Sequence, residues 1–250
     1  MNRIVVVPCF NEQYRFKLNY YKQLISIENT FWIFVNDGST DNTLKLIKKL
    51  ASAKNVAYLS HGRNIGKSNS IRLGIEYALG NISNIKWIGF LDADGAFSVE
   101  DVRTNLNLAM NKNMRFYDAI YSSRVKLSGR TINRNHLRHI FSRVVISFFG
   151  IIWKNIPYDT QSGFKLYRYN FDLKSLFTEP FNTRWFVDIE FTLRYIELKQ
   201  SALKVWEQPV LSWSDVAGSK VNKTQIFRLM TEIIFIYRKI FRLRKFLSLL

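Results

Sequence analysis

Short runs of β-branched and aromatic residues alternate with helix-like segments through the first half of the chain, and this alternation limits the possible folds most strongly. Runs typical of buried strands lie at residues 3–8, 31–36, 56–59 and 87–92. Segments 40–51 and 68–79 carry apolar residues at helical spacing. Strands that alternate with helices predict an α/β fold with a mostly parallel sheet that helices cover on both faces.

Polar side chains follow three of these strands. Asn11 and Glu12 come after the first strand, residues 37–41 after the second, and residues 92–95 after the last. In open parallel sheets, ligands bind beyond the carboxyl ends of the strands. The sequence therefore predicts a binding site along this edge rather than three unrelated turns.

Asp92 and Asp94 stand two residues apart at the end of a hydrophobic strand. On a turn, two carboxylates with this spacing can face one pocket. Mg²⁺ and Mn²⁺ prefer such oxygen ligands and usually keep phosphates and waters in their other positions. A solvated turn that caps a helix is the alternative, but the strand context and the neighbouring motifs favour a metal site.

The two other loops each have a structural and a functional interpretation. Gly38 allows a tight turn, and Thr40 or Asp41 can cap the following helix. Asp37 lies at the edge of the sheet, where it could instead accept hydrogen bonds from a nucleotide base or ribose. Residues 61–67 form a glycine-containing basic loop before a helix, which favours phosphate. The glycine spacing is not that of a P-loop.

The chain has 250 residues and a formal net charge of +18, with 37 Lys and Arg against 19 Asp and Glu. Residues 1–125 hold 16 basic and 10 acidic residues, whereas residues 126–250 hold 21 and 9. The excess indicates a polyanionic partner: nucleic acid, an anionic membrane or a phosphorylated substrate. No nucleic-acid-reading module is present, so nucleic acid is not expected. The single cysteine, Cys9, excludes an intrachain disulfide.

The second half is less regular. We expect strands at residues 119–123 and 163–167, a helix at 188–198, and a final helix over about 224–250 after a break at 218–220. These elements predict one domain over residues 1–220, with halves at 1–125 and 126–220. We expect an amphipathic, membrane-associating helix over residues 221–250.

Two segments combine cations with apolar residues. In the first, Arg134, Arg138 and His139 lead into an uncharged run at residues 144–153, which is too short to cross a bilayer because that takes about 20 residues. The second is the final helix. Its expected apolar face comprises Ile226, Met230, Ile233, Tyr237, Ile240 and Phe241, and its cations are Arg238, Lys239, Arg242, Arg244 and Lys245. Both segments suit an anionic membrane surface. A basic solvated face, packing on the domain and an oligomer contact remain alternatives.

The motifs occur in an order that resembles family 2 glycosyltransferases of the nucleotide-sugar-binding GT-A fold. Within that family the set is similar to the dolichyl-phosphate glucosyltransferase branch and its bacterial relatives, over roughly residues 3–220. The motifs that carry the resemblance are residues 5–12, 36–41, 64–67, 92–96, 122–124, 159–165, 185–190, 207–210 and 218–220. Ser122 replaces a glycine, Ser162 stands where the branch often has cysteine, and the family's transmembrane helices are absent from this sequence.

The resemblance implies that residues 1–220 are the catalytic domain, with a nucleotide-sugar-binding half at 1–125 and an acceptor half at 126–220. It also implies a role for each matching residue. The metal ligands are Asp94 and Asp92, for Mg²⁺ or Mn²⁺. The donor-binding set is Pro8, Asn11, Glu12, Asp37, Gly66, Lys67, Asp92 and Arg124. The acceptor-binding set is Gln161, Lys165 and Trp185, together with the cations of the basic segment, Arg134, Arg138 and His139. Asp188 is the first candidate for a general base and Glu190 the second. Alternatively, both are carboxylates that stabilise a helix N-terminus.

The implied reaction is an inverting, metal-dependent transfer of a hexose, with UDP-glucose as the first donor considered. The acceptor is a polyprenyl phosphate at the cytoplasmic face of the membrane, where the protein is expected to be peripheral. A saccharide hydroxyl of a lipid-linked or cell-surface glycan is the alternative acceptor. An inactive interaction subunit on the same fold is disfavoured because Asp92, Asp94 and Arg124 are all present.

Overall fold

A seven-stranded mixed sheet organises the molecule in the computed structural model, which describes residues 2–133, 157–177, 179–214, 216 and 223–247. Its strand order is β3-β2-β1-β4-β7-β5-β8. The strands are β1 (Arg3–Cys9), β2 (Thr30–Asp37), β3 (Val56–His61), β4 (Trp87–Leu91), β5 (Ala119–Ser123), β7 (Phe164–Arg168) and β8 (Val205–Pro209). Strand β7 runs antiparallel to β4 and β5, and the other neighbours pair in parallel. The expected mixed, mostly parallel sheet is confirmed.

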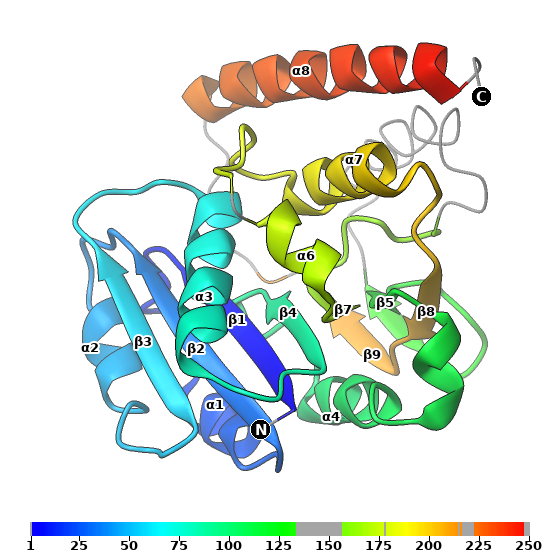
Figure 1. The fold of residues 1–250 in the computed structure, drawn as a ribbon. Helices are drawn as coiled ribbons and strands as arrows, with labels where there is room; N and C mark the ends of the chain where they lie inside the picture. Colours follow the sequence, from blue (N-terminus) through cyan, green and yellow to red (C-terminus); the bar gives the residue numbers. More distant parts are fainter. Residues whose placement is uncertain (1, 134–156, 178, 215, 217–222, 248–250) are drawn as a thin grey trace.

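Helices cover both faces of this sheet (Figure 1). The helices are α1 (Leu18–Ile25), α2 (Thr43–Lys48), α3 (Lys67–Asn81), α4 (Val99–Leu108), α6 (Phe171–Leu176), α7 (Val187–Lys199) and α8 (Lys223–Leu247), with a 3₁₀ helix η1 at Lys112–Phe116. A small parallel pair joins β6 (Thr131–Asn133) to β9 (Ser212–Ser214).

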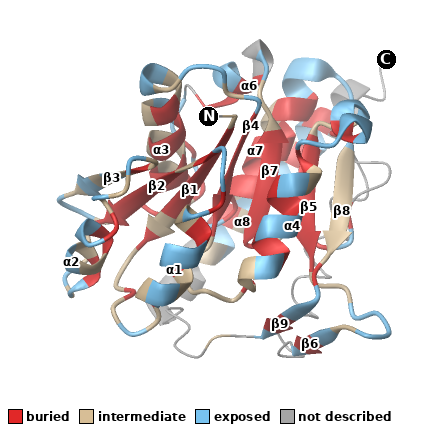
Figure 2. Ribbon diagram, turned by 90° about the horizontal axis from the view of Figure 1, so that it is seen from below, coloured by how far each residue is buried: buried red, intermediate tan, exposed pale blue. Residues whose placement is uncertain are grey.

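The alternation of side chains along β1 divides the core into two layers. Val5 and Val7 pack on the face that α1, α2 and α4 cover, whereas Ile4 and Val6 pack on the face that α3, α6 and α7 cover. The strands of the sheet are almost entirely buried apart from the outer ones (Figure 2). Because β1 and β4 are buried on both faces, they read as continuous apolar runs.

Helix α8 lies along α7 on the far side from the N-terminus (Figure 1), and its faces differ from those expected. Ile236, Ile240 and Leu243 are buried against Phe186, Ile189 and Leu193 of the α7 region. Ile233 packs on the same cluster. The expectation of a single lipid-facing surface is therefore wrong, because Ile233 and Ile240 turn toward the domain.

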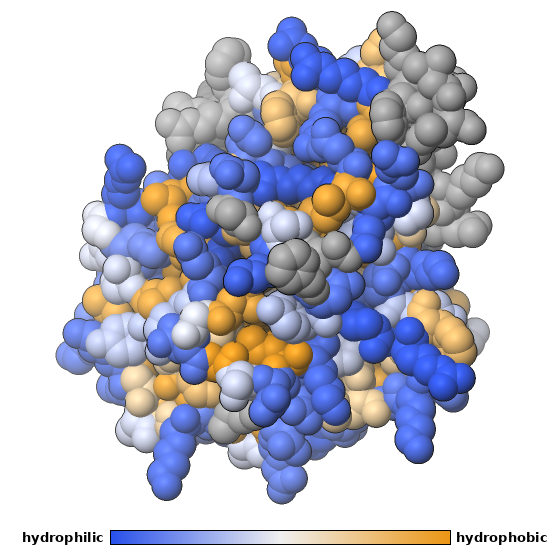
Figure 3. All heavy atoms as spheres, in the orientation of Figure 1, coloured by the Kyte–Doolittle hydropathy of each residue, from blue (hydrophilic) through white to orange (hydrophobic). Residues whose placement is uncertain are grey.

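A separate apolar stripe remains on the outer side of α8. Met230, Ile234, Tyr237 and Phe241 are 49–61% exposed. Their spacing of three and four residues places them on one side of the helix. Arg238 and Arg242 are also exposed, whereas Lys239 pairs with Glu197 of α7 at 2.9 Å. Figure 3 shows blue and orange side chains mixed in this region at the top of the molecule.

Several sequence expectations lie outside the described residues. They include Arg134, Arg138, His139 and the apolar run 144–153, as well as the break at 218–220. Within the described part of the chain, no helix is both long enough and apolar enough to cross a membrane.

Candidate active site

The loop that follows β4 carries Asp92 and Asp94. Its position is fixed on two sides: the backbone N–H of Asp92 donates to the Gly163 carbonyl at 2.8 Å, and the Tyr21 hydroxyl donates to the Ala93 carbonyl at 2.9 Å. A Cβ atom at Gly163 would lie 2.4 Å from Asp92 Oδ2, so a larger residue here would displace the Asp92 carboxylate. The loop is therefore placed by β7 and α1 together.

Two lysines meet two of the candidate carboxylates beside this loop. Lys67, the first residue of α3, places Nζ 2.5 Å from Asp92 Oδ1. Lys165 of β7 is fully buried and places Nζ 2.9 Å from Asp188 Oδ2 in the first turn of α7. Both ammonium groups also lie over the Phe90 ring, at 5.3 and 5.4 Å from its centroid. The structure thus brings together residues from α3, β4, β7 and α7.

The pKa values of these two lysines move in opposite directions. Burial lowers the pKa of Lys165, and the attraction of Asp188 only partly offsets it. For Lys67, burial also acts to lower the pKa, but the charges of Asp92, Asp188 and Asp94 outweigh it and raise the pKa. Lys67 therefore stays protonated in a site that contains three carboxylates.

Asp94 is the carboxylate with the best fit to a divalent cation. Burial raises its pKa, and the negative charge of Asp92 raises it further. Its carboxylate accepts from the backbone N–H of Ala96 at 3.1 Å. A divalent cation would compensate both carboxylates, and carboxylate oxygens are the ligands that Mg²⁺ and Mn²⁺ prefer. No cluster of three or more His, Cys, Asp or Glu that could hold a metal ion occurs among the residues described.

The loops that are expected to bind the donor are held together by hydrogen bonds among themselves. Asp37 is buried, and its carboxylate accepts from the backbone N–H groups of Ile65 and Gly66 at 2.7 and 3.0 Å. Burial raises the pKa of Asp37, and these hydrogen bonds only partly offset the effect. Gly66 has φ +95°, and a Cβ there would lie 2.8 Å from the Arg184 side chain. Asp37 therefore shapes the 61–67 loop.

The loop after β1 is tied to the loop after β2 in a similar way. The Asn11 carboxamide oxygen accepts from the Thr40 backbone N–H at 2.9 Å, and the Asn11 backbone N–H donates to Ser39 Oγ at 3.0 Å. Glu12 pairs with Arg15 at 2.5 Å. Pro8 is half-buried near the end of β1. These expected donor-binding residues lie at the carboxyl ends of the parallel strands β1 and β2.

Arg124, which follows β5, is held in a bidentate pair with Asp159. Its Nε and one terminal nitrogen each lie 2.7 Å from a carboxylate oxygen of Asp159, and that nitrogen also reaches the Gln161 carbonyl at 3.2 Å. The guanidinium stacks over the Trp213 ring. Glu207 accepts from the backbone N–H of Asp159 at 2.9 Å. Arg124 is thus fixed in orientation, and Asp159 balances its charge.

Glu190 does not share the environment of Asp188. Its side chain is fully buried, and it accepts from the backbone N–H groups of Asn182 and Thr183 at 3.0 and 2.8 Å. Arg194 pairs with it at 2.9 Å. Burial acts to raise the pKa of Glu190, but these hydrogen bonds and Arg194 prevail and lower it. This geometry suits a structural carboxylate and argues against Glu190 as a general base.

Other parts of the site escaped the sequence reasoning. Arg184 donates to the Asn64 carbonyl at 3.2 Å and also contacts Asn64 Oδ1, which links residues 181–186 to the 61–67 loop. Glu232 of α8 accepts from the backbone of the same segment. The available signal for Glu232 was that it is the single acidic residue of a basic helix. Trp185, expected on the acceptor side, is 37% exposed in this segment.

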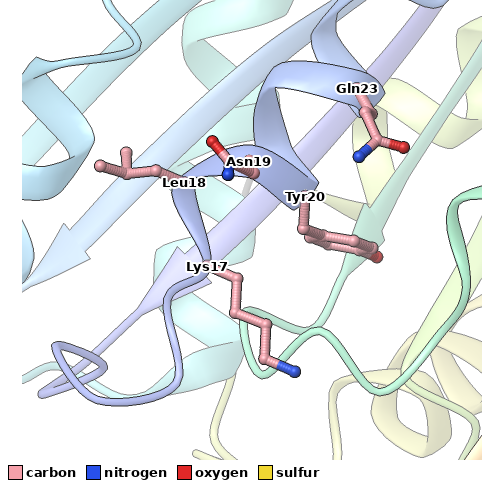
Figure 4. Close-up of a pocket in the computed structure, with 5 residues that line it drawn as sticks. All are labelled: Lys17, Leu18, Asn19, Tyr20 and Gln23. Carbon is pink, nitrogen blue, oxygen red and sulfur yellow. The ribbon is translucent and has the colours of Figure 1, made fainter.

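A hollow of about 460 Å³ opens at the start of α1, beside rather than within this cluster (Figure 4). Its lining residues are Lys17, Leu18, Asn19, Tyr20 and Gln23. A Cβ at Gly95 would lie 3.9 Å from the Tyr20 ring, so Tyr20 backs the loop that carries Asp94. The hollow contains none of the expected site residues.

Carboxylates and lysines gather at the edge of the sheet where open α/β folds bind their ligands, and comparison with known proteins identifies the family. The family model "Glycosyl transferase family 2" matches residues 4–174. The chain belongs to this family and is a glycosyltransferase.

Two curated proteins are similar to this chain over most of its length. It is 28% identical over 241 residues to a dolichyl-phosphate β-glucosyltransferase of Saccharomyces cerevisiae, covering 87% of this chain and 68% of the yeast protein. It is 26% identical over 238 residues to an uncharacterised protein of Methanocaldococcus jannaschii, covering 92% and 97% of the two chains.

Solved structures support the GT-A fold. A mannosyltransferase from Pyrobaculum calidifontis, solved with GDP-Man and Mn²⁺, superposes with a TM-score of 0.64 at 13% identity, covering 96% of this chain and 64% of that one. Glucosyl-3-phosphoglycerate synthase from Mycobacterium tuberculosis, solved with Mn²⁺, UDP-Glc and phosphoglyceric acid, gives a TM-score of 0.63 at 14% identity, covering 96% and 79%.

Proposed function

We propose that this glycosyltransferase moves a hexose from a nucleotide-sugar, with UDP-glucose as the first candidate, to a polyprenyl phosphate. The observation that carries the proposal is the cluster in which Lys67 meets Asp92 and Lys165 meets Asp188. The similarity to a dolichyl-phosphate β-glucosyltransferase supports the lipid-phosphate acceptor. The cations would attract two phosphorylated substrates, while the carboxylates keep the site close to neutral.

In this proposal the donor occupies the edge formed by the loops after β1, β2, β3 and β4. Pro8, Asn11 and Glu12 border the nucleoside, and Asp37 holds the loop that ends in Gly66 and Lys67. Asp94, with Asp92, would hold Mg²⁺ or Mn²⁺. Such an ion, when bound, offsets negative charge on the departing nucleoside diphosphate.

The transfer itself is a single displacement with inversion. An oxygen of the acceptor attacks the anomeric carbon, and the bond from that carbon to the diphosphate oxygen breaks. Lys67 lies at the N-terminus of α3, where its ammonium and the helix dipole both favour phosphate. Arg124 is held by Asp159 with its plane fixed, and Gln161 borders it on the acceptor side.

Asp188 offers a way to distinguish two acceptors. One carboxylate oxygen meets Lys165, and the other makes no hydrogen bond to the residues described. A lipid phosphate is already anionic near neutral pH and needs little deprotonation, whereas a saccharide hydroxyl needs a base. The uncommitted oxygen of Asp188 therefore favours keeping a saccharide hydroxyl as the second candidate acceptor.

Replacing Asp188 by asparagine is expected to lower kcat by only about 10-fold with a lipid phosphate, because the loss is then limited to the charge balance around Lys165. With a hydroxyl acceptor the loss should reach about 10²–10⁴-fold, the usual contribution of a general base. The measurement is kcat against pH for both enzymes with each acceptor. A large loss confined to the hydroxyl acceptor would identify Asp188 as its base.

We also propose that the protein is peripheral at the cytoplasmic face of the membrane, through the outer stripe of α8. Met230, Ile234, Tyr237 and Phe241 are exposed there, with Arg238 and Arg242 alongside. An apolar stripe beside cations suits an interface with anionic headgroups. The opposite face of α8 packs on α7, so the helix could present this stripe while remaining docked.

Replacing Met230, Ile234 and Phe241 by serine in one variant is expected to reduce co-sedimentation with anionic vesicles by at least about 10-fold. The substitutions remove the apolar contribution to interfacial binding. The matched control replaces three exposed apolar residues remote from α8, Tyr58, Met110 and Phe116. Equal binding of both variants and the unaltered protein would refute the membrane role of α8. Point variants are preferable to deleting residues 224–250, because α8 also packs on the catalytic domain.

The donor and acceptor are tested by a panel of radiolabelled donors with undecaprenyl phosphate, with products separated by thin-layer chromatography. UDP-glucose is expected to label the lipid fastest, ahead of UDP-galactose, UDP-linked N-acetylhexosamines and GDP-mannose. Labelled lipid from a different donor would correct the sugar assignment. Label only in a saccharide acceptor would replace the proposed lipid phosphate.

A further inference from the structure

Glu232 is the single acidic residue of α8, and it lies on the face turned toward the domain. It is 7% exposed. One carboxylate oxygen accepts from the Arg184 backbone N–H at 3.0 Å and the other from the Trp185 backbone N–H at 3.3 Å. Glu232 therefore binds the 181–186 segment through both of its oxygens.

Docking of α8 does not by itself explain a buried carboxylate. Ile236, Ile240 and Leu243 already pack the helix on Phe186, Ile189 and Leu193. Burial raises the pKa of Glu232, and the hydrogen bonds from the backbone of Arg184 and Trp185 only partly offset this effect. A buried charge is costly unless its hydrogen bonds compensate it, so these two hydrogen bonds are the evident reason for an acid at this position.

The 181–186 segment is in turn joined to the N-terminus of α3. The Arg184 carbonyl accepts from the Ser68 backbone N–H at 3.0 Å, and the Asn69 side chain pairs with both backbone groups of Phe181 at 2.9 and 3.1 Å. The Arg184 guanidinium reaches Asn64. These contacts place the segment directly against the loop that begins α3.

The contacts then continue into the candidate donor site. Gly66 approaches the Arg184 side chain so closely that it has no room for a Cβ. The backbone N–H groups of Ile65 and Gly66 donate to Asp37. Lys67 follows at once and pairs with Asp92. A chain of direct contacts thus connects Glu232, Arg184, the 64–67 loop and Asp37.

We propose that Glu232 is a positioning residue for the donor site: it fixes the 181–186 segment, which in turn holds the 64–67 loop. The same segment leads into the first turn of α7, which carries Asp188 three residues after Trp185. Helix α8 is therefore part of the scaffold of the active site. The inference rests on the proposed donor site, but its structural part can be measured without any substrate.

The test replaces Glu232 by glutamine, which keeps one acceptor oxygen and turns the other into an N–H donor that faces a backbone N–H. Amide hydrogen exchange should rise about 10-fold at residues 181–186 and 64–68, the scale of losing one charged hydrogen bond. The KM for UDP-glucose should rise by a similar factor, with kcat changed less than 3-fold. Lys239→Met is the matched control, because Lys239 is also on α8 and this change breaks its pair with Glu197 of α7. It should change neither the exchange at these residues nor the KM.

Unchanged exchange at residues 64–68 in Glu232→Gln would overturn the proposal, even if the melting temperature falls. If wild-type protein does not turn over UDP-glucose, the donor assignment fails, and the exchange result still decides the role of Glu232. If Glu232→Gln does not fold, Arg184→Met carries the test. It leaves the Glu232 hydrogen bonds to backbone in place, and it must raise exchange at residues 64–68 for the proposal to stand.

Discussion

Replacement of Asp94 by asparagine is expected to lower kcat/KM for glycosyl transfer by about 10³-fold, close to 4 kcal/mol of transition-state stabilisation. Asp94 lies at the carboxyl end of β4, and burial and the charge of Asp92 both raise its pKa. A divalent cation would offset this repulsion between the two carboxylates. Asparagine keeps the shape but removes the charge that would hold the ion.

The measurement compares transfer rates across a Mn²⁺ titration. Asp94→Asn should stay nearly inactive even at high Mn²⁺, with an unchanged melting temperature. Asp118→Asn is the control, because Asp118 precedes β5 at the opposite end of the parallel strands, where its carboxylate accepts from Lys204. Full activity of Asp94→Asn at ordinary Mn²⁺ would remove Asp94 from the metal site.

Replacement of Glu190 by glutamine is expected to destabilise the fold by about 3 kcal/mol at pH 7, as for other buried pairs that lose one partner. The change leaves Arg194 without its charged partner, at a position where the Glu190 side chain is fully buried. It also weakens the hydrogen bonds from the Asn182 and Thr183 backbone. The free energy of unfolding from urea titration measures the effect.

This destabilisation should depend on pH in a defined direction. The pKa of Glu190 is lowered in the folded protein, so its ionised form stabilises the fold above the unfolded pKa of about 4.3. The difference between wild type and Glu190→Gln should be largest at neutral pH and shrink as pH falls below about 4. Glu197→Gln, which breaks the partly solvent-exposed pair with Lys239, should cost no more than about 1 kcal/mol. A pH-independent difference would show that the charge of Glu190 is not what stabilises the fold.

The central strands of the sheet were predictable because they are buried on both faces. Residues 3–8, 31–36 and 87–92 read as continuous apolar runs and become β1, β2 and β4 with shifts of one residue or so at each end. Helix α1 was missed because it is short and its N-terminus has no side-chain cap. Helix α4 carries a cap that could have been recognised, since Ser98 Oγ accepts from the Asp101 backbone N–H.

The site was predictable only as far as the edge of the sheet on which it lies. The motifs placed Asp92, Lys67 and Asp188 among the candidates, but which charge meets which partner depends on the antiparallel insertion of β7 between β4 and β5. Glu190 sits only two residues from Asp188, yet it points to a different set of partners because neighbouring positions on a helix face different directions. No local pattern distinguishes the two.

Helix α8 illustrates the limit of periodicity. Apolar residues that recur at helical spacing identify a helix, but this helix has two apolar sides, one against α7 and one exposed. The sequence alone does not show that Ile233 and Ile240 are on the packed side and Met230 and Phe241 on the exposed side, because this depends on the position of α7. The partner of Glu232 is likewise distant in sequence, 47–48 residues away.

The most direct test of the proposed reaction is transfer of radiolabelled glucose from UDP-glucose to polyprenyl phosphate by the purified protein, with Mn²⁺ or with EDTA. We expect a labelled lipid that appears only with the metal and that is released by mild acid as free glucose, as a glycosyl phosphate bond should be. A labelled lipid formed equally well in EDTA would contradict the role given to Asp92 and Asp94. The absence of labelled lipid with every donor of the panel would contradict the lipid-phosphate acceptor.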